Sequence, residues 1–116
     1  MKILVVDDSI NDFKLAEKIY QSNKDVHVTH AKNGIQGLHM LNKEELPDII
    51  LLDIAMPQLD GMEFLRRIRT FDVLKEIKVI ITSAMKKEDY PELKELNITN
   101  YQQKPIPIET YKEFLN

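Results

Sequence analysis

Apolar residues along this chain fall into short continuous runs that alternate with longer stretches in which they recur at every third or fourth position. The clearest run is Ile49 to Leu52, and a second occupies residues 3–6. Four consecutive apolar, partly β-branched residues predict a strand that is buried on both faces, as in a parallel sheet. Less continuous runs at residues 26–30, 78–84 and 98–103 predict three more strands.

The periodic stretches between the strands predict amphipathic helices. The first helix reaches about residue 22, and the second opens at Asn33-Gly34 and closes before Pro47. Asp60 and Glu63 have the spacing of an N-terminal capping pair for the third helix. The side chains expected to face the core are Ile10, Phe13, Leu15, Ala16, Ile19 and Tyr20 in the first helix, Ile35, Leu38 and Leu41 in the second, and Phe64, Leu65 and Ile68 in the third.

Two further helices complete the pattern. Residues 85–96 hold the fourth, which Pro91 shortens or delays because proline has no N–H to donate inside a helix. The fifth runs from about Pro107, and its inward side chains are Ile108, Tyr111, Phe114 and Leu115. Five strands that alternate with five helices predict βαβ units, and therefore an α/β fold with a parallel sheet covered on both faces.

Acidic residues follow two of the predicted strands. Asp7 and Asp8 come directly after the first strand, and Asp53 ends the third. Ligands of doubly wound α/β sheets bind beyond the carboxyl ends of the strands, at the point where the strand order reverses. If the order is 2-1-3-4-5, this point lies between the first and third strands, and the three acids share one pocket. The alternative is that they are solvated loop residues or helix caps.

Three ionised aspartates in one pocket require a counter-charge, because two unit charges 4 Å apart repel by roughly 4 kcal/mol at an effective dielectric near 20. A hard divalent ion with oxygen ligands, such as Mg²⁺, supplies it. The other strand ends carry Thr82-Ser83 and Lys104, and the second strand contributes only His30. A nucleophilic carboxylate, metal ligands, a hydroxyl and a fixed cation are the groups that phosphoryl transfer needs.

Composition and charge exclude several other classes of protein. A chain of 116 residues with 43% hydrophobic and 30% charged residues is expected to form one domain, residues 1–116, with its own core. A net charge of −3 gives no electrostatic signature for nucleic acid, and the absence of cysteine excludes disulfides and thiol chemistry. No apolar run has the length of a signal peptide or membrane span, so we expect a cytoplasmic protein that binds neither nucleic acid nor membrane.

Four motifs combine these strand-end residues: Val5-Val6-Asp7-Asp8-Ser9, Leu52-Asp53-Ile54-Ala55-Met56-Pro57 with Asp60-Gly61, Ile81-Thr82-Ser83-Ala84, and Lys104-Pro105. They resemble those of the receiver domain of two-component response regulators, in particular the stand-alone, chemotaxis-response-regulator-like kind. The likeness covers essentially the whole chain, which would be either a stand-alone receiver or one cut from a longer protein. It implies a flavodoxin-like (βα)5 three-layer sandwich with strand order 2-1-3-4-5, and a cis peptide between Lys104 and Pro105.

The resemblance implies a phosphoaspartate switch rather than an enzyme that turns over a separate substrate. Asp53 would take a phosphoryl group from a histidine kinase or histidine phosphotransfer protein, and the protein would catalyse its own phosphorylation and dephosphorylation. Asp7, Asp8, Asp53 and the backbone carbonyl of Ala55 would hold Mg²⁺. Lys104 would pair with Asp53 and then with a phosphoryl oxygen.

The resemblance also implies how the signal leaves the site. Ser83, in preference to Thr82, would move onto the phosphoryl group, and Tyr101 would turn into the space that it leaves. A downstream protein target would read the face formed by the fourth helix, fifth strand and fifth helix, and the protein would be a monomer or a phosphorylation-dependent dimer. Ala55 and Met85 stand where the family often has polar residues, which predicts slow loss of the phosphoryl group.

Three competing interpretations follow from the same residues. A metal-dependent phosphatase of the haloacid dehalogenase type would need a second acid two residues after the first, where this chain has Ala55. A flavodoxin-type electron carrier would cradle phosphate in its first loop, and Asp7-Asp8 would repel that phosphate. A receiver-like interaction module that is never phosphorylated would not need the full set of acceptor, metal acids, hydroxyl and lysine.

Overall fold

Five parallel strands form a single sheet in the computed structural model, which describes residues 1–41, 45–55, 61–96, 98 and 100–116. The order is β2-β1-β3-β4-β5, so the predicted order 2-1-3-4-5 is confirmed. The first and third strands are neighbours, and the strand order reverses between them. The strands are β1 (Lys2–Val6), β2 (His27–Ala31), β3 (Ile49–Asp53), β4 (Lys78–Ser83) and β5 (Tyr101–Gln103).

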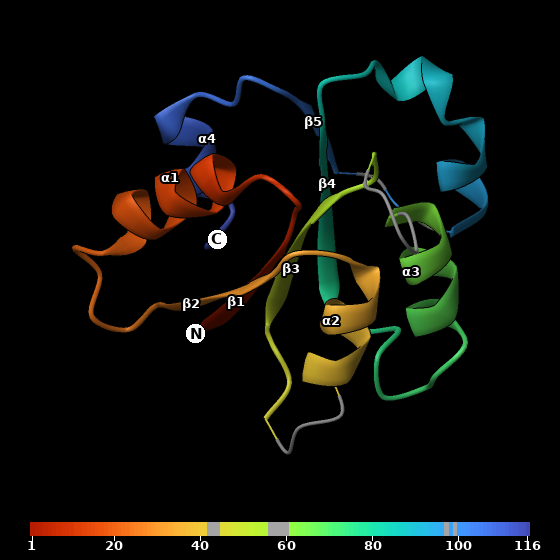
Figure 1. Ribbon diagram of the computed structural model, residues 1–116, viewed down its shortest axis with the longest axis horizontal. Coiled ribbons are helices and arrows are strands. Elements are labelled where there is room, and N and C mark those ends of the chain that lie inside the picture. The colour runs from red at the N-terminus through yellow and green to blue at the C-terminus, as the bar shows by residue number, and fades with distance from the viewer. Residues whose placement is uncertain (42–44, 56–60, 97, 99) are drawn as a thin grey trace.

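Helices cover both faces of the sheet and give three layers (Figure 1). Helices α1 (Ile10–Tyr20) and α4 (Ile108–Glu113) lie on one side, and α2 (Gly34–Met40) and α3 (Gly61–Arg69) lie on the other. Alternate residues of each central strand point to opposite layers because the side-chain period of a strand is two. Ile3, Val5, Ile49 and Leu51 pack in the cluster beneath α1 and α4, whereas Leu4, Val6, Ile50 and Leu52 pack with α2 and α3.

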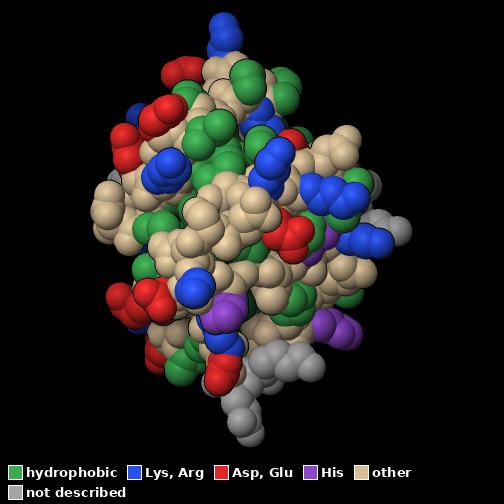
Figure 2. All heavy atoms as spheres, turned by 90° about the vertical axis from the view of Figure 1, so that its left-hand side faces the viewer, with side chains coloured by type: hydrophobic (Ala, Val, Ile, Leu, Met, Phe, Trp, Pro, Cys, Tyr) green, Lys and Arg blue, Asp and Glu red, His purple; other side chains and the backbone are tan. Residues whose placement is uncertain are grey.

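Four of the side chains predicted to face the core are exposed instead. Ile10, Leu15, Ile35 and Ile108 are 45%, 42%, 49% and 52% exposed, respectively. Three of them are the first or second residue of a helix, where the chain has only begun to cross the sheet, so apolar periodicity alone does not bury them. On the side that carries α1, hydrophobic side chains are accordingly visible at the surface between charged ones (Figure 2).

The segment before the last strand differs from the prediction. It forms two 3₁₀ helices, η1 (Lys87–Asp89) and η2 (Pro91–Leu96), instead of one α-helix. The proline that starts η2 cannot donate a hydrogen bond to a preceding helical turn, and this separates the two pieces. The last strand begins at Tyr101 rather than at residue 98, because the amide of Ile98 donates to a carbonyl of η2 (3.2 Å) and not to the sheet.

Two further sequence predictions concern the loops. The turn predicted at residues 56–60, including Asp60 of the expected capping pair, lies outside the described residues; α3 itself begins at Gly61. The second helix ends at Met40, earlier than Pro47 would require. In the part of the chain that the structure describes, no helix has the length and apolar character needed to span a membrane.

Candidate functional site

The carboxyl ends of β1 and β3 bring three acids together. Carboxylate oxygens of Asp7, Asp8 and Asp53 all lie within 4.8 Å of one another. Asp7 and Asp53 are buried, whereas Asp8 is exposed and faces solvent. An oxygen-only cluster that is open on one side fits a hard divalent cation that keeps some of its water ligands, as Mg²⁺ does.

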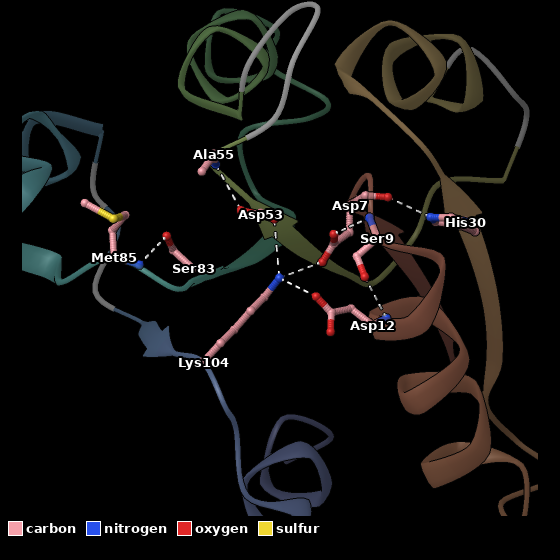
Figure 3. A network of polar contacts seen from close by, with 9 residues as sticks. All are labelled: Asp7, Ser9, Asp12, His30, Asp53, Ala55, Ser83, Met85 and Lys104. Atoms are coloured by element: carbon pink, nitrogen blue, oxygen red, sulfur yellow. Dashed lines mark hydrogen bonds and ion pairs between the residues drawn. The ribbon is translucent and has the colours of Figure 1, made fainter.

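Lys104 follows β5 and reaches across the sheet edge into this cluster (Figure 3). Its amide donates to the carbonyl of Ser83 (2.7 Å), which extends the pairing of β4 with β5 by one residue. Its ammonium nitrogen lies 3.0 Å from Asp7 Oδ2, 3.3 Å from Asp53 Oδ2 and 2.6 Å from Asp12 Oδ2. Burial lowers the pKa of Lys104, but the hydrogen bonds with Asp12 and Asp7 and the nearby charges raise it above its ordinary value, so the side chain is a fixed cation.

Asp7 is held through every polar group that it has. Its amide donates to the carbonyl of Ala31 (3.0 Å), and its carbonyl accepts from His30 Nε2 (2.7 Å). Its Oδ1 accepts from the amide of Ser9 (2.9 Å), and Oδ2 accepts from Lys104. Burial nevertheless raises the pKa of Asp7 to about 6, against the lowering effect of the Ser9 and Lys104 contacts. The geometry thus holds a carboxylate that is costly to ionise in the absence of a further cation.

Asp53 is fixed at the end of the most buried strand. Its Oδ1 accepts from the amide of Ala55 (2.9 Å), and its Oδ2 faces Lys104. The first residue of α3 packs directly against this strand end, and a Cβ at Gly61 would lie 2.3 Å from Ile54 Cα and 2.6 Å from the Asp53 carbonyl oxygen. Only glycine permits this approach, so Gly61 sets where the chain turns after the acid.

Ser83 and Tyr101 both bind the backbone of the same residue. Ser83 Oγ is fully buried and accepts from the amide of Met85 (3.0 Å). The hydroxyl of Tyr101 donates to the carbonyl of Met85 (2.6 Å). The backbone of Met85, in the loop after β4, therefore lies between the predicted hydroxyl and the predicted aromatic and is hydrogen-bonded to both.

The structure adds groups that sequence reasoning missed. Asp12 was not among the predicted site residues, yet its carboxylate makes the shortest contact with Lys104. The available signal was Ser9-x-x-Asp12, a helix-start pattern directly after a strand that ends in acids. His30, expected only at an edge strand end, supports the Asp7 carbonyl and stacks on Phe13, with ring centroids 4.4 Å apart.

The comparison with known proteins agrees with this site. A family model of the response regulator receiver domain matches residues 3–116. The chain is 37% identical over 114 residues to sporulation initiation phosphotransferase F of Bacillus subtilis, which covers 97% of this chain and 88% of the relative. It is 31% identical over 117 residues to chemotaxis protein CheY-3 of Vibrio cholerae, which covers 100% of this chain and 89% of the relative.

Solved structures give the same result. Chemotaxis response regulator CheY4 of Vibrio cholerae has a TM-score of 0.87 and 27% identity, with coverage of 98% of this chain and 94% of that one. Receiver domains are phosphoacceptors that bind Mg²⁺ at an acidic pocket and interact with histidine kinases or phosphotransfer proteins. The matched family model and the relatives confirm the resemblance seen in the motifs, and the chain belongs to the response regulator receiver domains of two-component signal transduction, which are phosphorylated on aspartate.

Proposed function

We propose that Asp53 is the aspartate that accepts the phosphoryl group, and that residues 1–116 act as one phosphoacceptor unit in the cytoplasm. The observation that carries this proposal is the position of Asp53, a buried acid 3.3 Å from a fixed ammonium group. A carboxylate oxygen of Asp53 forms the new O–P bond while the N–P bond of the donor's phosphohistidine breaks, and the imidazole nitrogen keeps the electron pair. Lys104 stabilises the negative charge that spreads over the phosphoryl oxygens.

Asp7, Asp8 and Asp53, together with the carbonyl of Ala55, are the groups that would hold Mg²⁺. The clustering of the three carboxylates supports this assignment, because it places more negative charge at one point than Lys104 offsets. The pKa of Asp7 is raised chiefly by burial, so a further cation beside it would favour the ionised form. When bound, the ion neutralises carboxylate and phosphoryl oxygens and orders them for in-line transfer.

Ser83 and Tyr101 are proposed to carry the signal away from Asp53. A phosphoryl group adds charge and strong acceptor oxygens, which attract the Ser83 hydroxyl away from the amide of Met85. Tyr101 holds the carbonyl of the same residue, so its rotamer is coupled to that movement. The surface formed by η1, η2, β5 and α4 would then change shape and bind a downstream protein target.

The test is phosphorylation by acetyl phosphate with and without Mg²⁺, followed by intact-mass spectrometry. The wild type should gain one phosphoryl group only with Mg²⁺, and Asp53→Asn should gain none. Asp25→Asn removes an equal charge from an exposed loop and should behave as the wild type. Phosphorylation of Asp53→Asn, or of the wild type in EDTA, would contradict the proposal.

A further inference from the structure

Lys104 has no free hydrogen-bond donor in this structure. An ammonium group has three N–H donors, and three carboxylates, those of Asp7, Asp12 and Asp53, lie at hydrogen-bond distance from it. Asp12 is the nearest at 2.6 Å, and Asp53 is the farthest at 3.3 Å. The lysine is therefore held most closely by an acid that belongs neither to the phosphoacceptor strand nor to the acid cluster after β1.

The Asp12 carboxylate is available to Lys104 because another acid, Asp7, accepts the hydrogen bond that Asp12 would accept in a capping box. It is the third residue of α1, and Ser9 caps the helix by accepting from the Asp12 amide (3.2 Å). In a capping box the acid at this position accepts in return from the amide of the cap residue. Here the Ser9 amide donates to Asp7 Oδ1 instead (2.9 Å), so the Asp12 carboxylate turns to Lys104.

We propose that Asp12 is a positioning residue that shares Lys104 with the phosphoacceptor, and thereby weakens binding of the phosphoryl group and strengthens binding of the divalent cation. The inference rests on the function proposed above. Asp12 holds part of the lysine's charge on the α1 side, away from the oxygens that a phosphoryl group would present. Its own negative charge repels that group and attracts a cation in the adjacent acid cluster.

Opposite effects on two ligands distinguish this role from a structural one. Loss of the carboxylate in Asp12→Asn frees one donor of Lys104 and removes one negative charge. Beryllofluoride, a stable mimic of the phosphoryl group, should then bind roughly three- to tenfold more tightly at saturating Mg²⁺, an effect kept modest because the Asp12 side chain is 37% exposed. Mg²⁺ alone should bind several-fold more weakly. A variant that only disturbed the fold would weaken both ligands.

The experiment is isothermal titration of each protein with Mg²⁺ alone and then with beryllofluoride at saturating Mg²⁺. Glu17→Gln is the matched control, because it removes one negative charge from an exposed position of the same helix. Asp12→Glu keeps the charge and should stay closer to the wild type than Asp12→Asn does. The proposal predicts opposite shifts in Asp12→Asn and less than a twofold change in Glu17→Gln.

Three results would overturn the inference. Unchanged or weaker beryllofluoride binding by Asp12→Asn would show that Asp12 does not compete for Lys104. Equal shifts in Glu17→Gln would assign the effect to net charge rather than to the contact. A wild type that binds no beryllofluoride with Mg²⁺ would overturn the proposed function, and with it this inference.

Discussion

Replacement of Asp7 by Asn is expected to stabilise the metal-free protein at pH 8. The Asp7 side chain is 4% exposed, and its pKa is raised from 3.8 to about 6, chiefly by burial. An acid with a higher pKa in the folded state binds its proton more tightly there than in the unfolded chain. The free energy of unfolding therefore falls as the pH rises from about 4 to 6, and it stays lower above that range. Asn carries no charge at any pH and avoids this loss.

The magnitude follows from the difference between the two pKa values. A rise from 3.8 to about 6 corresponds to about 3 kcal/mol at pH 8, because each unit of pKa is worth about 1.4 kcal/mol. Asn keeps an oxygen that accepts from the Ser9 amide, but its NH2 group cannot accept from the Lys104 ammonium, so the ion pair is lost and part of the gain with it. We therefore expect the variant to gain roughly 1 to 3 kcal/mol.

Urea unfolding in EDTA, followed by circular dichroism, measures this gain. The difference between Asp7→Asn and the wild type should be largest at pH 8 and should shrink towards zero near pH 4. Asp8→Asn removes the neighbouring charge at an exposed position, where solvent screens it, and should change stability by less than about 1 kcal/mol. If Asp7→Asn is no more stable than the wild type at pH 8, the ion pair with Lys104 outweighs the cost of burial and the reasoning is wrong.

Three other predictions concern the same edge of the sheet. The affinity for Mg²⁺, measured by titration calorimetry, should fall as the pH drops through about 6, because a proton on Asp7 competes with the metal; constant affinity between pH 5 and 8 would contradict this. Gly61→Ala should destabilise the protein by about 3 kcal/mol in urea unfolding and weaken Mg²⁺ binding, because its Cβ would meet the Asp53 carbonyl oxygen at 2.6 Å. Phosphorylated protein should lose its phosphoryl group slowly because Ala55 and Met85 bring no polar side chain to the hydrolytic water; a half-life of seconds would refute this, and Met85→Asn should shorten it.

Much of the fold was predictable because the strands of a parallel sheet are buried on both faces. Continuous apolar runs such as residues 3–6 and 49–52 are typical of the central strands of such a sheet. Their alternation with helix-period segments predicts the βαβ topology. Burial at helix starts was not predictable in the same way. Ile10 and Ile108 obey the helical period but sit where their helices begin, and no local signal tells how far a helix overlaps the sheet.

The acids at strand ends were predictable for a topological reason, and Asp12 was not. Residues that follow parallel strands must meet at one edge, so Asp7, Asp8 and Asp53 come together once the strand order is known. Asp12 belongs to a helix, where the direction of a side chain depends on the rotation of the helix about its axis. It also depends on which carboxylate accepts from the amide of the cap residue Ser9. The local hydrogen bond from the Ser9 amide to Asp7 frees the Asp12 carboxylate, but its partner Lys104 lies 92 residues away in the sequence and is brought near only by the tertiary fold.

Repulsion between the acids at the carboxyl ends of β1 and β3 explains why this edge of the sheet would respond to ligands. Among the described residues, the carboxylates of Asp7, Asp12 and Asp53 contact the ammonium group of Lys104, and that of Asp8 lies beside Asp7 and Asp53, so the folded chain keeps an excess of negative charge there. A cation that binds only the folded state lowers this cost and stabilises the protein in proportion to its concentration. A phosphoryl group on Asp53, as proposed above, would add negative charge to the same place, and a bound cation would offset that charge. Binding of the cation and binding of a phosphoryl mimic such as beryllofluoride would then be thermodynamically coupled, and each would raise the affinity for the other by the same factor.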